Sequence, residues 1–110
     1  MDINGQEFSV DLGHDHWLKF FQWSPDRDLN PQYEDIPDVP KAGALVAHRR
    51  RDGSWCMSGI GFDSESMRRV DPNGPKWAVE SWEPLTISPS LLCKACGDHG
   101  FIRGGKWVPA

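Results

Sequence analysis

Glycine and proline interrupt this chain so often that few segments are long enough for a regular helix. Eleven Gly and nine Pro are spread over 110 residues. Dipeptides such as Asn4-Gly5 and Asp52-Gly53 are typical of tight turns. Between the turns, short segments alternate apolar and polar residues, as half-buried strands do. The sequence therefore predicts a mainly β fold. We expect one small antiparallel β domain over residues 1–110, with hairpins and a few short helical turns.

The clearest hairpin is "GALVAHRRRDGSWCMSGIGF", with expected arms at residues 43–50 and 54–62. Two registers are open. A two-residue turn pairs Arg51 with Ser54. A three-residue loop with Gly53 in a left-handed conformation pairs Arg50 with Ser54, and the same register then sets His48 opposite Cys56.

Further segments fit the same fold class. Strands are expected at 7–13, 16–23 and 76–82, a short helix at 63–70, and a tail hairpin around Gly104-Gly105. Residues 24–42 are rich in proline and acidic side chains. Since proline lacks an amide donor and restricts the residue before it, we expect an extended acidic surface loop there.

Charge and cysteine content exclude several classes of protein. Twelve Lys and Arg against sixteen Asp and Glu give a formal net charge of −4, which argues against a protein that coats nucleic acid. The N-terminus has no signal-peptide pattern, and no apolar run approaches the roughly 18 residues that span a bilayer. Three cysteines, two of them close together, suit a reduced compartment. We therefore expect a cytoplasmic protein without a membrane partner.

The pair Cys93-x-x-Cys96 is the strongest chemical signal in the chain. Such a turn lets two thiolates converge on one ion, and His99 is close enough in sequence to add a ring nitrogen. The expected cofactor is a structural Zn²⁺, which prefers four tetrahedral ligands of this kind. The fourth ligand would come from another segment, with Cys56 preferred, His48 second, and His14 and His16 as further candidates. Buried free thiols and a redox pair are the alternatives.

A basic group forms the second candidate site. Arg49, Arg50 and Arg51, with Arg68 and Arg69, could bind a partner or nucleic acid, and Trp55 could stack on a base. The simpler interpretation is a hairpin tip kept soluble by its charge. We find no zinc-deaminase, metalloprotease-helix or phosphate-loop motif, and no Ser/His/Asp arrangement stands out. No catalytic residue is therefore predicted.

The tail "EPLTISPSLLCKACGDHGFIRGGKW" and the upstream "GALVAHRRRDGSWC" resemble a family of small bacteriophage proteins. These are encoded notably by phages of actinobacteria, and related domains of unknown function occur in bacteria. The residues that carry the resemblance are Ser88-Pro89-Ser90, Cys96, His99, Phe101-Ile102 and Trp107. Relatives carry an additional cysteine cluster after the position of His48, which is missing here. The resemblance implies a zinc-stabilised β fold and a phage accessory protein made during infection.

Three functions follow from these observations. The preferred one is a zinc-stabilised, non-enzymatic interaction module that binds a host or phage protein in the host cytoplasm, as a monomer or homodimer. The alternative is a zinc-knuckle protein that binds single-stranded nucleic acid through its arginines. A metal-dependent hydrolase is the third; it would need an open metal position and a base such as His14, His16 or Asp98.

Overall fold

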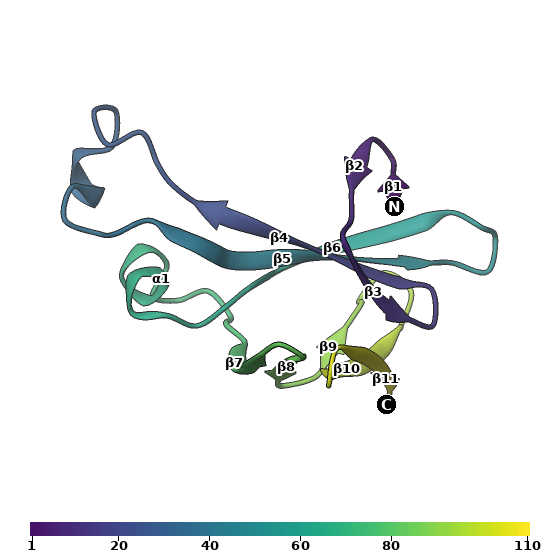
Figure 1. Ribbon diagram of the computed structural model, residues 1–110. Helices are drawn as coiled ribbons and strands as arrows, with labels where there is room; N and C mark the ends of the chain where they lie inside the picture. Colours follow the sequence, from purple (N-terminus) through teal and green to yellow (C-terminus); the bar gives the residue numbers. More distant parts are fainter.

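The computed structural model describes residues 1–110, and its strands pair antiparallel throughout (Figure 1). The expected mainly antiparallel β fold is therefore confirmed. The elements in chain order are β1 (Asp2–Ile3), β2 (Gln6–Glu7), β3 (Val10–Gly13), β4 (His16–Trp23), the 3-10 helix η1 (Pro31–Tyr33), β5 (Val39–Arg49), β6 (Trp55–Gly61), α1 (Glu65–Val70), β7 (Ala78–Trp82), β8 (Leu85–Ser88), β9 (Leu91–Leu92), β10 (His99–Arg103) and β11 (Lys106–Pro109).

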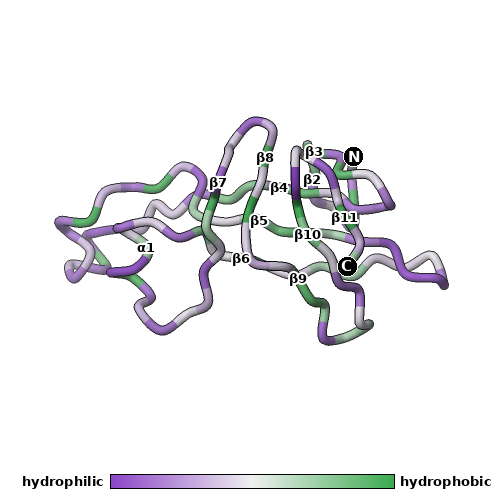
Figure 2. Tube along the Cα trace, turned by 90° about the horizontal axis from the view of Figure 1, so that it is seen from below, coloured by the Kyte–Doolittle hydropathy of each residue, from purple (hydrophilic) through white to green (hydrophobic).

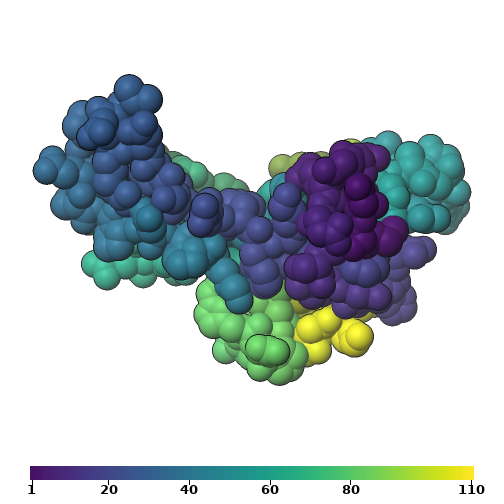
Figure 3. Space-filling model, turned by 45° about the horizontal axis from the view of Figure 1, so that its top comes forward, coloured from purple at the N-terminus to yellow at the C-terminus, as the bar shows by residue number.

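A four-stranded sheet in the order β3-β4-β5-β6 is the largest sheet of the molecule. The eleven residues of β5 make it long, and the molecule extends 45 × 29 × 25 Å. Figure 3 shows residues 24–38 projecting at one end and the β5–β6 hairpin tip at the other. A smaller sheet in the order β11-β10-β9 and the ribbon β7-β8 lie beneath one face of the long sheet (Figure 1).

The main core lies between the long sheet and these C-terminal strands. The long sheet contributes its alternate residues, as the period of a strand requires. The C-terminal strands do the same, and Ile102 is completely buried. The buried members of this cluster are Leu12, Leu18, Ala44, Val46, Ile60 and Phe62 from the first half, and Leu85, Ile87, Leu91, Ile102 and Trp107 from the second. The same core face continues along the sheet to His16, His48 and Cys56, all buried.

The opposite face of the long sheet is covered by the N-terminal segment. Ile3 and Phe8 are buried there against Ala47, with Trp17 and Trp55 packed around them. In Figure 1 the β1–β2 ribbon accordingly lies on the other side of the sheet from β9–β11. The sheet is thus enclosed on both faces near the His48 end of β5.

The hairpin adopts the three-residue register. Arg50 N donates to Ser54 O at 2.7 Å, and Gly53 has φ of +87°. His48 consequently pairs with Cys56. The second of the two registers expected from the sequence is therefore the observed one.

The acidic loop is more structured than expected. η1 lies within it, and β5 begins at Val39, so residues 39–42 are strand. The expected helix is present as α1, where the Ser64 side chain caps Met67 N at 3.1 Å. The tail hairpin turns at Gly104-Gly105, both with positive φ, as expected. No helix of the structure has the length and apolar character needed to span a membrane.

Candidate metal centre and a neighbouring serine–histidine pair

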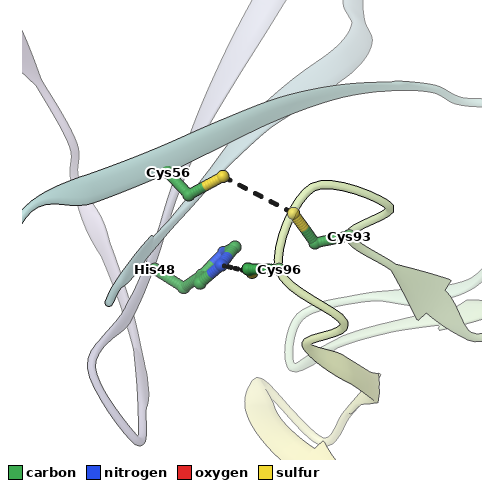
Figure 4. Close-up of side chains that lie close together, drawn as sticks. All are labelled: His48, Cys56, Cys93 and Cys96. Atoms are coloured by element: carbon green, nitrogen blue, oxygen red, sulfur yellow. Dashed lines mark hydrogen bonds between the residues drawn. The ribbon is translucent and has the colours of Figure 1, made fainter. Parts of the chain in front are cut away.

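Four side chains with metal-binding atoms converge from three places in the chain. His48 on β5 and Cys56 on β6 are direct cross-strand neighbours, while Cys93 and Cys96 belong to the loop between β9 and β10. Their ligand atoms all lie within 4.8 Å of one another. His48 Nε2 is 2.9 Å from Cys96 Sγ, and Cys56 Sγ is 3.5 Å from Cys93 Sγ (Figure 4).

This arrangement fits a tetrahedral ion. Metal–ligand bonds of about 2.0–2.3 Å in a tetrahedron separate the donors by roughly 3.3–3.8 Å. The 3.5 Å between the Cys56 and Cys93 sulfurs lies in this range, and the 2.9 Å between His48 Nε2 and Cys96 Sγ is shorter than it. The donors are one imidazole and three thiols, a soft set that suits a closed structural site. The cluster His48, Cys56, Cys93 and Cys96 could therefore hold a metal ion.

The loop of residues 93–98 has a backbone that directs both thiols toward the same point. Gly97 N donates to Cys93 O at 2.7 Å, and Cys93 N donates to Asp98 O at 2.7 Å. Gly97 has φ of +80°, a left-handed conformation that glycine adopts without steric cost. The tight turn closes where β9 and β10 pair, so the loop is an extension of that two-stranded ladder.

A carboxylate stands behind the histidine of the cluster. Asp98 Oδ2 lies 2.7 Å from His16 Nε2 and 3.8 Å from His48 Nδ1. The His16 ring stacks on Trp107 with 4.0 Å between ring centroids, which fixes its position. Burial lowers the pKa of His48, against the opposing effect of Asp98. A lowered pKa favours the neutral imidazole, the form whose lone pair can bind a metal.

His99 lies apart from this cluster, although its spacing from Cys96 suggested a ligand. Its Nε2 is 2.9 Å from Ser90 Oγ. Because His99 is the first residue of β10 and pairs with Leu92, it lies on the outer face of the small sheet. The structure thus brings Cys93 and Cys96 together with both leading candidates for the fourth ligand, Cys56 and His48, and places the expected third ligand, His99, against a serine.

The serine–histidine pair is held by strand contacts. Ser90 directly precedes β9, and its carbonyl accepts a hydrogen bond from Trp77 Nε1 at 3.3 Å. The His99 carbonyl accepts one from Ala110 N at 3.0 Å. No hydrogen bond joins His99 to a carboxylate, so the pair is a dyad. Ser90 is partly buried and His99 is exposed, so the Oγ–Nε2 contact lies at the protein surface.

The expected basic residues are found in two separate places. A hollow of about 440 Å³ lies beside His48 and Cys96 and is lined by Arg49, Arg50 and Arg51. Arg49 lies over the Trp55 ring at 4.9 Å from its centroid, and Arg50 donates to Cys56 Sγ at 3.3 Å.

The other two arginines are at the far end of the molecule. Arg68 and Arg69 belong to α1 and bind Asp63 and Asp35, at 3.2 and 2.8 Å. Figure 1 shows α1 and the hairpin tip at opposite ends, so the five arginines do not form one patch.

The chain was compared with known proteins and protein families. A search of curated proteins and a search of solved structures found no match. Among protein-family models, one matches residues 32–110 and is described as "bacterial ubiquitination-like system serine protease (BubE)". The matched region is well over half of the chain and contains both the four-donor cluster and the Ser90–His99 pair. The chain therefore belongs to the BubE family, whose members are described as serine proteases of a bacterial ubiquitination-like system.

Proposed function

We propose that this protein is a serine hydrolase of a bacterial ubiquitination-like system, with Ser90 as the nucleophile and His99 as the general base. The observation that carries the proposal is the 2.9 Å separation of Ser90 Oγ and His99 Nε2. This is hydrogen-bonding distance for a nucleophile and its base. A lone exposed serine–histidine contact says little, but here it falls within the match to a serine protease family.

The geometry supports acyl transfer in two steps. With the His99 proton on Nδ1, Nε2 accepts the Ser90 proton as Oγ attacks the carbonyl carbon of the scissile amide. The C–N bond then breaks, and His99 gives that proton to the leaving amine. Water, deprotonated by His99, hydrolyses the resulting ester and restores Ser90. The exposed position of His99 leaves the pair accessible to a protein substrate.

The cluster His48, Cys56, Cys93 and Cys96 is the proposed zinc site. Zn²⁺ bound there would have four protein ligands and no open position, so its contribution is structural. The chain's own residues support this role, because the loop that carries Cys93 and Cys96 joins β9 to β10. Ser90 directly precedes β9 and His99 begins β10. The metal would therefore hold the connection between the two reacting side chains and the long sheet.

A fluorophosphonate probe, which reacts with activated serines, tests the dyad without knowledge of the substrate. We expect wild-type protein to gain one adduct, located on Ser90 by mass spectrometry, and Ser90→Ala to gain none. His99→Gln should label at least about 10³-fold more slowly. Ser88→Ala is the matched control, since Ser88 is also partly buried and lies two residues away. Labelling that persists in Ser90→Ala would refute the assignment.

This proposal replaces the non-enzymatic module expected from the sequence and keeps its zinc. A phage setting, a cytoplasmic location, a host or phage partner and a homodimer stay predictions. Binding of single-stranded nucleic acid is the second candidate, favoured by the placement of Arg49 over Trp55 beside the hollow. Retention on single-stranded RNA that falls steeply with salt, and is lost in Arg49→Ala/Arg51→Ala, would support it.

A further inference from the structure

The small sheet β11-β10-β9 has two faces of very different character. Its inner face is formed by Leu91, Gly100, Ile102 and Trp107, all buried. The alternate residues point outward, because successive side chains of a strand lie on opposite faces. The register pairs Leu92 with His99, Phe101 with Val108 and Arg103 with Lys106. These six residues define the outer face.

Apolar and positively charged side chains follow one another along this face. Phe101 lies next to the dyad, with 6.3 Å between its ring centroid and that of His99. The Arg103 guanidinium is 4.0 Å from the Phe101 centroid. Leu92, on the other side of His99, is 57% exposed, a high value for a large apolar residue. Figure 2, which views the molecule from below, shows apolar stretches in β9 and β10.

The charge of this face is opposite to that of the whole chain. Its two ionised side chains, Arg103 and Lys106, are both positive and both exposed, while the chain has a formal net charge of −4. No carboxylate forms an ion pair with either of them. Two cations without an ion-pair partner, beside a partly exposed aromatic ring, complement a ligand that is apolar at one point and acidic at the next.

We propose that the outer face of β9–β11 docks an extended, apolar-acidic segment of the protein substrate and delivers its scissile bond to Ser90. This inference rests on the proposed hydrolase function. An apolar substrate side chain packs on Phe101 and its cross-strand neighbour Val108. A carboxylate farther along binds Arg103 and Lys106. The other edge of β9 has no strand partner, since β9 pairs only with β10, and Trp77 contacts that edge at the Ser90 carbonyl.

Strand geometry sets the spacing of the segment. Alternate residues of a strand are about 6.6 Å apart, so Arg103 is roughly 13 Å along β10 from His99. An extended substrate advances by the same amount per residue. The acidic side chain should therefore lie about four residues from the cleaved bond, and the apolar one about two residues from it.

The probe is a set of quenched fluorescent decapeptides. Each carries Leu two residues and Glu four residues from its central peptide bond. A second set has Lys in place of Glu. For wild-type protein we expect kcat/KM about tenfold higher with Glu than with Lys, and a smaller ratio at 0.5 M NaCl. Arg103→Glu/Lys106→Glu should reverse the preference, and Phe101→Ala should lower kcat/KM for both sets.

The matched control is Arg68→Glu/Arg69→Glu, which reverses two charges on α1 at the other end of the molecule and should keep the preference. Fluorophosphonate labelling of Ser90 separates the two proposals. Labelling that is normal in Arg103→Glu/Lys106→Glu, with the preference reversed, supports docking. Normal labelling of wild type with equal cleavage of both sets, or with no cleavage, overturns docking and leaves the hydrolase. Absence of labelling in wild type overturns both.

Discussion

The two ends of the long sheet are held together by different kinds of contact. At one end, residues 24–38 are closed mainly by contacts within their own neighbourhood: Arg27 binds Asp38 at 2.6 Å, and Trp23 meets Tyr33 edge-on. One exposed ion pair, between Asp35 and Arg69, also ties this segment to α1 across 34 positions. At the other end, the cluster joins β5 and β6 to a loop near the C-terminus, with 48 positions between His48 and Cys96. The dyad lies beside the second kind of contact. The convergence of metal-binding side chains from distant parts of the sequence therefore distinguishes the end of the sheet that carries the proposed catalytic pair.

Among the predictions that test this difference between the two ends, loss of the metal should lower stability and labelling the most. Cys56→Ser removes one thiol from β6, whose only strand partner is β5. Because metal binding contributes directly to folding, we expect loss of the zinc and a fall in Tm of roughly 10 °C or more. Labelling of Ser90 should fall as well, since the β9–β10 loop loses its attachment. Elemental analysis, thermal unfolding and fluorophosphonate labelling measure the three effects.

Ser58→Ala, an exposed position on the same strand, is the control and should retain one zinc per chain. Full labelling and an unchanged Tm in metal-free Cys56→Ser would show that the dyad end is held by its apolar core alone. Neither end of the sheet would then depend on a metal for its stability.

The sequence predicts the donors of this centre better than its surroundings. The Cys93-x-x-Cys96 spacing is a local signal that predicts two of the four clustered residues. The Asp52-Gly53 turn, in one of its two registers, sets the other two, His48 and Cys56, opposite each other, and the sequence offered them as alternatives for a fourth ligand. His99 was expected among them because only two residues separate it from Cys96. Sequence distance does not reveal that the left-handed Gly97 and the pairing of β10 with β9 turn its ring outward.

The proposed catalytic pair, which the sequence did not predict, depends on how two neighbouring strands pair, although its members are only nine positions apart. Ser90 and His99 meet because β9 and β10 pair across the loop that holds the cysteines. The signal available was the tail motif, which contains both Ser90 and His99 but has no spacing typical of a triad. Asp98 and His16 are 82 positions apart, so their contact could not be read from the chain at all.

Asp98→Asn should weaken metal binding without disrupting the fold. The substitution removes the negative charge near His48 Nδ1 and His16 Nε2. Carboxylates behind a ligating histidine typically contribute 10–100-fold to metal affinity, and we expect a loss in this range. Competition with a chromophoric zinc chelator measures it. Asp15→Asn, an exposed carboxylate with no side-chain contact, is the control. Equal affinity in both variants would exclude a supporting role for Asp98.

Trp77→Phe should produce a smaller effect, restricted to the nucleophile. The variant keeps an aromatic ring but removes the hydrogen bond from Nε1 to the Ser90 carbonyl. Such a bond contributes about 1 kcal/mol, so we expect a Tm lower by several degrees and labelling slowed a few-fold. The zinc content should stay the same. A normal labelling rate would mean that β9 alone positions Ser90, while loss of zinc would mean that the two sites share more structure than proposed.

Arg27→Gln, at the opposite end, should have the smallest effect. Hydrogen bonds from Arg27 and Ser24 hold the pKa of Asp38 below its ordinary value. The ion pair therefore contributes its stability above the ordinary pKa, and this contribution is lost as the pH falls through the lowered one. In Arg27→Gln, the NMR titration of the Asp38 carboxyl should move up toward its ordinary value. Because the pair is exposed, Tm and Ser90 labelling at pH 7 should barely change. A marked fall in labelling would show that the long sheet transmits changes between its ends, and the contrast between local and long-range closure would no longer separate structure from function.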